Sequence, residues 1–551
     1  MAKYIMSLIL SIVMTGCSGF FDTVPYDALS PSTTWKTEKD ANSFAIGCYS
    51  GFVNGAYLLY ADCASDIGYN KFPWEGWTNI GNGTLSASDP GASYYNFTTI
   101  RRCNTFLENV DKVQFKDESA KKDLIAQVRT IRAYKYFELN FWYGGVPIID
   151  SYLSAEEAQV PRKTEDEVKQ FIYEELDASI PDLQVMPSQV GRIGRATALA
   201  IKMRSALYWG DLERSLSAAE EIINMQQYQL DSDYANLFTL AGKTSPEIIY
   251  AVQYLENVQS LGTIGQMYNN VDGGWSSIVP TQNLVDMYEM EDGLPKEESS
   301  LYNPSLPFYK RDPRMKMTIL YPGQNWKAKG KEEVILNTLD KEIKKKDANG
   351  QEISVINDNY YANANNASQT GLSWAKYTVP MDQYSDIWKT AACPILFRYA
   401  EVLLSYAEAK NELNGPSNDV YEKLDLVRNR VGMPSVDRKK YSSREALREL
   451  IRRERTVEFA GEGLRRADIL RWKDASGKML AESVLNGDLC RIVGTINYEE
   501  SDPTKRAVIN TQASLEEKKI ETRKFRSHNR YYPIPQSSID KNPNLKQNEG
   551  Y

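Results

Sequence analysis

The sequence predicts a mainly α-helical protein, in which tetratricopeptide-like helix pairs form a scaffold for a large irregular, loop-rich region with a few short strands. Apolar residues recur at helical spacing over about residues 98–230. The same pattern returns over about 396–462. Between these stretches, over about 231–390, and before them, over about 55–97, the periodicity gives way to Gly, Asn, Pro, Tyr and Trp. The helical scaffold is therefore expected to be interrupted by irregular segments.

The first helical stretch has clear boundary signals. One long helix is predicted in KDLIAQVRTIRAYKYFELNFWYGGVP, where Gly144-Gly145 and Pro147 end it. Thr164 followed by Glu167 has the spacing of a capping box, which predicts the start of a second helix. Gly210-Asp211 predicts a tight turn between two further helices.

The second helical stretch repeats this layout. A helix is predicted in FRYAEVLLSYAEAKNELNG, where Gly415-Pro416 ends it, and another in NDVYEKLDLVRNRVGMP. Each helix pair occupies roughly 34 to 37 residues, close to the tetratricopeptide period. Three or four such pairs would stack as a right-handed solenoid, in which each pair contacts its neighbours. A generic helical bundle is the alternative.

The irregular segments are too long to be simple connections. Loops of this length are usually functional or disordered, and their aromatic content argues against disorder. The motifs EVILNT and ISVIN are predicted to be short strands.

The N-terminus has the pattern of a bacterial lipoprotein signal peptide. Lys3 precedes a short apolar run, and Thr15-Gly16 stand directly before Cys17. We therefore expect residues 1–16 to be removed, Cys17 to carry lipid, 17–30 to form a flexible tether and 31–551 to form one domain. An ordinary secretory signal followed by an incidental cysteine is the alternative.

Composition excludes several classes of function. A net charge of -8 and a pI near 5.3 argue against nucleic-acid binding. His528 is the one histidine, which removes His-rich metal sites and leaves little scope for a Ser-His-Asp triad. We expect no catalytic residue and no cofactor. A structural calcium ion remains an open alternative at Asp382–Asp386 or Asn357–Asn359, although neither matches an EF-hand loop.

The cysteines after Cys17 are five in number, so at least one is unpaired. A Cys48–Cys63 or a Cys63–Cys103 disulfide is compatible with a protein outside the cytoplasm. Buried free thiols are the alternative.

The segment LRELIRRERTVEFAGEGLRRADILRW has the highest density of charge. On a helix, Glu449 and Arg453 lie on adjacent turns, as does Glu454 with its arginine neighbours. We interpret this segment as a structural ion-pair network. An anion-binding strip is the alternative.

Aromatic residues in the irregular segments are the best indication of a binding site. A partly exposed indole offers a flat face to the C–H groups of a sugar ring. Tyr69, Trp74 and Trp77 lie close in sequence to Asp66 and Asn70, whose side chains could bind sugar hydroxyls. Further aromatics of these regions are Trp275, Trp326, Trp374 and Trp388.

Five segments, taken in order, resemble the SusD/RagB family of outer-membrane lipoproteins that bind glycans at the bacterial cell surface. They are FFDTVPYD, RTIRAYKYFELNFWYGGVPII, ILFRYAEVLLSYAEAKNEL, RRERTVEFAGEGLRRADILRW and YYPIPQSSIDKNPNLKQNEGY. The resemblance covers nearly the whole mature chain and implies a tetratricopeptide-like half, an irregular half with the ligand site, and a SusC-like TonB-dependent transporter as partner. It also implies lipid anchoring in the outer membrane, facing the cell surface.

The resemblance narrows the expected function and site. We expect a non-enzymatic protein that captures oligosaccharides or polysaccharide and delivers them to the transporter. A surface lid that binds peptide or another nutrient, or less favourably a glycoside hydrolase, is the alternative. The expected glycan-binding residues are Asp66, Tyr69, Asn70, Trp74, Trp77, Trp275 and Trp326.

Overall fold

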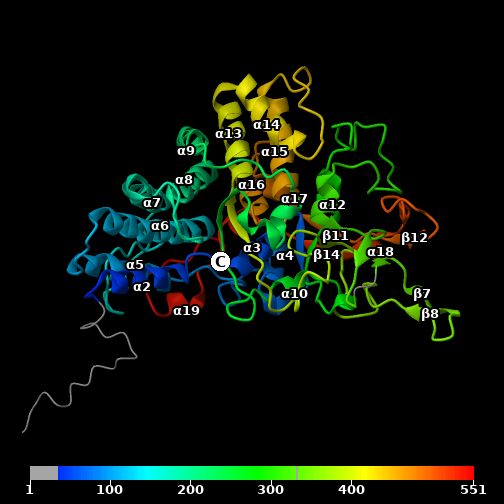
Figure 1. Cartoon of the computed structure of the whole chain (residues 1–551), viewed down its shortest axis with the longest axis horizontal. Helices are drawn as coiled ribbons and strands as arrows, with labels where there is room; N and C mark the ends of the chain where they lie inside the picture. The colour runs from blue at the N-terminus through cyan, green and yellow to red at the C-terminus, as the bar shows by residue number, and fades with distance from the viewer. Residues whose placement is uncertain (1–34, 331–332) are drawn as a thin grey trace, which may run out of the picture.

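The computed structural model describes residues 35–330 and 333–551 (Figure 1). The predicted signal peptide, the lipidation site Cys17 and the whole predicted tether lie outside the described residues. Helices occupy the left and top of the view in Figure 1, whereas short strands and loops occupy its right and lower parts. The helical scaffold and the irregular region are therefore separate parts of one molecule, as the sequence predicts.

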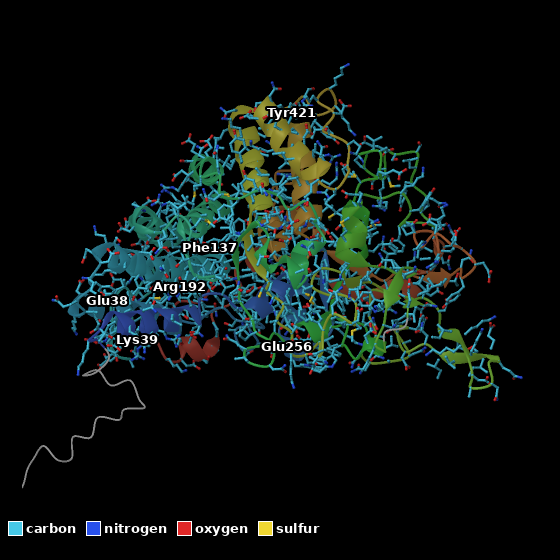
Figure 2. All side chains as sticks on the ribbon, in the orientation of Figure 1. Glu38, Lys39, Phe137, Arg192, Glu256 and Tyr421 are labelled. Carbon is cyan, nitrogen blue, oxygen red and sulfur yellow. The ribbon has the colours of Figure 1, made fainter. Side chains whose placement is uncertain are left out.

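The first group of helices forms a layered array on the left of Figure 1. Its main members are α2 (Glu38–Tyr49), α5 (Thr98–Asn109), α6 (Glu118–Tyr143), α7 (Glu165–Ser179), α8 (Arg195–Trp209) and α9 (Leu212–Asn224). The predicted capping box is confirmed, because the Thr164 side chain accepts the Glu167 N–H and the Glu167 carboxylate accepts the Thr164 N–H. Phe137 of α6 lies among these helices (Figure 2), and its ring centroid is 5.8 Å from that of Tyr208 in α8.

The second group of helices continues the first in space. It comprises α13 (Tyr399–Asn414), α14 (Asn418–Asn429), α15 (Arg444–Phe459), α16 (Arg465–Arg471) and α17 (Leu480–Val484). Helix α13 packs against α9 although a long irregular segment separates them in the sequence. The predicted solenoid of helix pairs is thus one continuous stack. Among the described residues, no helix has both the length and the apolar character that crossing a membrane requires.

The irregular region is held together by small antiparallel sheets of two strands each. The pairs are β1 (Gly68–Asn70) with β3 (Ile278–Pro280), β2 (Ile248–Ala251) with β10 (Ile395–Arg398), β4 (Ile319–Leu320) with β9 (Ser373–Trp374), β5 (Asn325–Lys327) with β6 (Glu333–Ile335), β7 (Glu342–Lys346) with β8 (Glu352–Ile356), β11 (Gly487–Cys490) with β14 (Lys519–Arg523), and β12 (Gly494–Ile496) with β13 (Ala507–Ile509). The strands predicted in EVILNT and ISVIN are confirmed as β6 and β8. Tyr69 pairs with Val279, so the β1–β3 sheet joins the two irregular segments.

Short helices complete the irregular parts of the chain. They are α3 (Gly55–Tyr60), α4 (Thr78–Asn82), α10 (Ile264–Met267), α11 (Gln282–Met287), α12 (Arg314–Thr318), α18 (Leu515–Lys518) and α19 (Gln536–Ile539). The 3₁₀ turns η1 (Ala61–Ala64) and η2 (Pro73–Glu75) flank β1.

A buried ion-pair network connects α15 to the irregular region. Arg398 is 1% exposed and contacts Glu462 at 2.7 Å, Glu458 at 2.7 Å and Glu247 at 2.8 Å. The predicted structural network is therefore confirmed, but most of its partners come from other elements. Glu454 pairs with Arg314 and Arg428, and Arg453 pairs with Glu289, not with Glu449. Tertiary packing brings these charges closer than the turns of a single helix do.

The cysteines of the described residues are free thiols. Cys48, Cys63, Cys103 and Cys393 are buried, and Cys490 is partly exposed. The two disulfides that the sequence left open are therefore absent, and the free-thiol alternative holds for these residues.

Asp62 ties the start of the irregular region to the end of α15. Its buried carboxylate accepts the backbone N–H groups of Gly461 at 2.7 Å, Gly463 at 3.3 Å and Arg465 at 3.3 Å. Burial raises the pKa of Asp62 to about 6, because the backbone donors only partly compensate for lost hydration.

We expect Asp62→Asn to reduce the pH dependence of stability between about pH 4 and pH 6. In that window native Asp62 binds a proton, whereas in the unfolded chain, with a pKa near 3.9, it largely does not. Its contribution to stability therefore falls as pH rises through the window. Urea midpoints measured from pH 4 to 7 would show a smaller acid-to-neutral change in the variant. Parallel curves for the two proteins would contradict this role.

Candidate ligand-binding site

The turn η2 presents one indole ring to solvent. Pro73 begins the turn and Gly76 ends it in the left-handed region, at a φ of 83°. A Cβ at Gly76 would lie 2.8 Å from the backbone nitrogen of Ala92, so the position also requires close approach. Trp74 is 72% exposed and stacks on Phe72, with ring centroids 4.5 Å apart. The turn therefore holds Trp74 outward on a buried aromatic support.

A second indole, that of Trp275 from the middle of the chain, lies next to Phe72. Trp275 follows the turn at Gly273-Gly274, and its backbone N–H donates to the Gly265 carbonyl at 3.0 Å. Trp275 is 36% exposed, and its ring centroid lies 6.3 Å from that of Phe72 and 4.9 Å from that of Trp388. Trp74, Phe72, Trp275 and Trp388 thus form a row of rings, which we call the aromatic platform.

A half-buried carboxylate ties together the two loops that carry the platform. Glu75, next to Trp74, accepts hydrogen bonds from Asn70, Gln266 and Ser277. Burial raises the pKa of Glu75, and the hydrogen-bond donors oppose this shift. Asn70 also donates to the Ser277 carbonyl at 3.0 Å. Glu75 and Asn70 therefore link the segment that carries Trp74 to the segment that carries Trp275.

Three aromatic residues that the sequence placed in the site lie in the core. Tyr69 is 8% exposed and packs with Val279 and Leu489. Trp77 is 1% exposed and stacks on Tyr60 at 5.7 Å. Trp326 is 5% exposed, and its N–H donates to Asp272 at 2.7 Å. Here the structure differs from the prediction, since a covered ring presents no face to a ligand.

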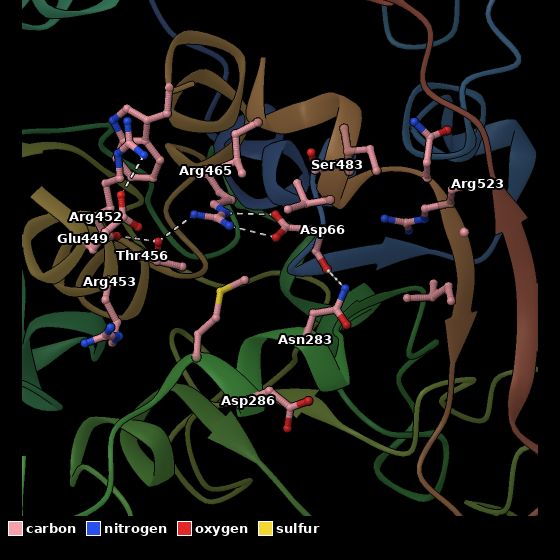
Figure 3. A pocket seen from close by; sticks show the side chains of 18 of the residues that line it. Asp66, Asn283, Asp286, Glu449, Arg452, Arg453, Thr456, Arg465, Ser483 and Arg523 are labelled. Atoms are coloured by element: carbon pink, nitrogen blue, oxygen red, sulfur yellow. Dashed lines mark hydrogen bonds and ion pairs between the residues drawn. The ribbon is translucent and has the colours of Figure 1, made fainter. Parts of the chain in front are cut away.

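Asp66 lies at a different place, in the wall of a polar cavity of about 670 Å³ (Figure 3). Its carboxylate receives two hydrogen bonds from Arg465, at 2.9 and 2.8 Å, and is 1% exposed. Arg465 also donates to Thr456, and Arg452 pairs with Glu449, which lies one turn earlier on α15. The charged side chains named here are therefore already paired with one another. Asp66 is thus paired with Arg465 in a place separate from the platform, and its role in glycan binding stays a prediction.

Two members of the platform, Phe72 and Trp388, were outside the expected site set. Trp388 belongs to the aromatic residues of the irregular region that the sequence analysis named, but nothing in the local sequence indicates that it contacts Trp275. Phe72 adjoins the Pro73-Trp74 turn, which is the local signal that could have identified it. The Trp388 ring packs on Gly265, where a Cβ would lie 2.4 Å from a ring carbon.

The turns considered for calcium are occupied by internal hydrogen bonds. The Asn357 side chain donates to the backbone carbonyls of Asn337 and Asp340, and the Asp386 carboxylate accepts the backbone N–H of Trp388. Within residues 35–330 and 333–551, no three His, Cys, Asp or Glu side chains gather as a metal site would require.

Comparison with known proteins identifies the class to which this fold and platform belong. The profile of the SusD family matches residues 246–551. A second profile, described as starch-binding associating with outer membrane, matches residues 20–202. The chain belongs to the SusD family.

Individual relatives extend over most of the chain. SusD-like protein P25 of Formosa agariphila is 25% identical over 494 residues, covering 83% of this chain and 87% of the relative. SusD-like protein P2 of the same organism is 27% identical over 523 residues, with coverages of 86% and 91%. A SusD-like carbohydrate-binding protein from Bacteroides fragilis has a TM-score of 0.78 at 27% identity, covering 93% of this chain and all of that one.

Proposed function

We propose that this chain is a cell-surface glycan-binding lipoprotein of the outer membrane, which captures oligosaccharides or polysaccharide and delivers them to a SusC-like TonB-dependent transporter. The observation that carries the proposal is the aromatic platform, with its exposed Trp74 and Trp275, in the irregular region of a SusD-family chain. The carbohydrate-binding relative of similar fold and the family description of outer-membrane association support it. Cys17 would supply the lipid anchor.

The proposed mechanism is stacking of sugar rings on Trp74, Trp275 and Trp388. Indole faces interact with the C–H face of a pyranose, while nearby polar groups bind its hydroxyls. The tilt of 58° between Trp275 and Trp388 suits a curved chain better than a flat one. Modest affinity at each site suffices, because many tethered copies act together at the surface.

We further propose that the glycan is bound without being cleaved. A glycosidase needs two carboxyl groups about 5 to 9 Å apart on either side of the scissile bond. Glu75, the carboxylate next to Trp74, instead accepts hydrogen bonds from Asn70, Gln266 and Ser277.

Native affinity gels with plant, mucin, fungal and bacterial polysaccharides test this function on the chain from residue 18 onward. Slower migration in at least one glycan, with the glycan intact, is the expected result. Degradation would favour the hydrolase, and unchanged migration in every glycan would favour a lid for peptide or another nutrient.

We expect Gly265→Ala to weaken glycan binding about threefold to tenfold, because the new methyl group displaces the Trp388 ring. The binding constant and the melting temperature should be measured together. Gly47→Ala is the matched control, since the nearest atom to its new Cβ is Arg102 Cδ at 3.7 Å. Equal affinities of the wild type and Gly265→Ala would exclude Trp388 from the platform.

A further inference from the structure

A lysine without an acidic partner lies beside Phe72 of the aromatic platform. Lys71 precedes Phe72, and its ammonium lies 5.4 Å from the centroid of that ring. The ammonium donates to the backbone carbonyl of Asn365, and no carboxylate of the described residues forms an ion pair with it. Lys71 is half-buried, and burial lowers the pKa of its ammonium. A cation here has lost hydration without gaining a counter-charge.

A second lysine without an ion pair, the exposed Lys329, lies near Trp275 and Trp388. The backbone N–H of Lys329 donates to Asp272 at 2.8 Å, which fixes this residue beside the turn before Trp275. Its ammonium lies close to Gly273, 3.6 Å from where a Cβ would stand. The Gly273 carbonyl in turn accepts the Trp388 indole N–H at 3.3 Å. Within the described ranges Lys329 also forms no ion pair.

The carboxylates near the platform are mostly engaged elsewhere. Asp272 accepts from Trp326 and Lys329, and Asp386 accepts from the backbone of Trp388. Asp382 pairs with Lys327. Glu256, which Figure 2 places at the lower edge of the molecule, accepts the Ser385 hydroxyl.

Two further acidic residues complete the surroundings. Glu75 accepts hydrogen bonds from Asn70, Gln266 and Ser277. Asp358 contacts Asn270 through its backbone carbonyl. Neutral hydrogen-bond donors hold most of these carboxylates, whereas the cations beside the platform that form no ion pair within the described residues are Lys71 and Lys329.

We propose that the aromatic platform binds an anionic glycan, whose carboxylate or sulfate groups are received by the ammonium groups of Lys71 and Lys329 while its sugar rings stack on the indoles. This inference rests on the proposed glycan-binding function and specifies the class of glycan. A charge-assisted hydrogen bond is stronger than a neutral one. The anion also supplies the counter-charge that a half-buried ammonium lacks. Neutral glycans would gain only the stacking.

Matched pairs of charged and neutral glycans test this proposal and distinguish the two anions. For carboxylates the pair is polygalacturonate and its methyl ester, and for sulfates it is a sulfated galactan and its desulfated form. Calorimetric titration should show tighter binding to the charged member of at least one pair. The expected difference is roughly tenfold, and it should shrink when NaCl is raised from about 50 to about 300 mM.

Lysine substitutions locate the effect on the chain. Lys71→Met and Lys329→Met should each weaken binding of the charged glycan roughly fivefold to tenfold, and should leave binding of its neutral counterpart nearly unchanged. Lys439→Met removes the same charge from an exposed loop far along the sequence and should change neither. The melting temperature of Lys71→Met should equal or exceed that of the wild type, because no ion pair is lost.

Two results would overturn the proposal, and they have different consequences. Equal affinity for charged and neutral forms, with Trp74→Ala abolishing both, would exclude an anionic ligand but leave the glycan-binding function intact. Absence of binding to every glycan, charged or neutral, would overturn the proposed function as well.

Discussion

Replacing Arg398 with methionine should destabilise the protein by about 3 to 5 kcal/mol, because it strands buried carboxylates without their cation. Arg398 contacts Glu247, Glu458 and Glu462 within 2.8 Å, and all of these side chains are buried. The arginines around Glu458 hold the pKa of that carboxyl far below its usual range even though burial opposes them. The native state therefore depends on the ions staying charged and paired.

Urea unfolding followed by tryptophan fluorescence measures this effect. The control is Arg438→Met, which removes an exposed ion pair with Asp425 at 3.1 Å. Exposed pairs contribute at most about 1 kcal/mol. Equal unfolding midpoints for the two variants would show that the buried network does not stabilise the junction between α15 and the irregular region.

The double substitution Trp74→Ala with Trp275→Ala should weaken glycan binding by about a hundredfold, through loss of two stacking faces at roughly tenfold each. Both rings are substantially exposed, so the fold should be retained. Calorimetric titration with the glycan that the affinity gels identify measures the loss.

Tyr152→Ala is the matched control for this double variant. Tyr152 is a half-exposed aromatic of the helical scaffold, where its hydroxyl accepts from Arg101 at 2.8 Å. Its removal should leave the affinity unchanged. If the tryptophan variant bound the glycan as tightly as the control did, the platform would not be the binding site.

Local features of the sequence predicted the scaffold well. The capping box at Thr164 and the turn at Gly210-Asp211 depend on residues only a few positions apart, so a single sequence contains the necessary information. The partners of Arg398 cannot be predicted in this way, because they come from elements that only the folded chain brings together.

The site was predictable in part. Trp74 and Trp77 lie three residues apart in a similar context, yet one ring faces solvent and the other stacks on Tyr60. Packing around α4, not residue type, decides between them. The contact between Trp275 and Trp388 likewise depends on a distant segment folding back over Gly265. A single sequence can therefore indicate an aromatic site, but it cannot say which rings remain exposed.

A crystal structure of the chain with the bound oligosaccharide tests the central claim most directly. We predict sugar rings lying against the exposed faces of Trp74 and Trp275, with Lys71 or Lys329 within hydrogen-bond distance of an anionic group. An oligosaccharide found instead in the polar cavity beside Arg465 and Asp66, with the platform empty, would contradict the account.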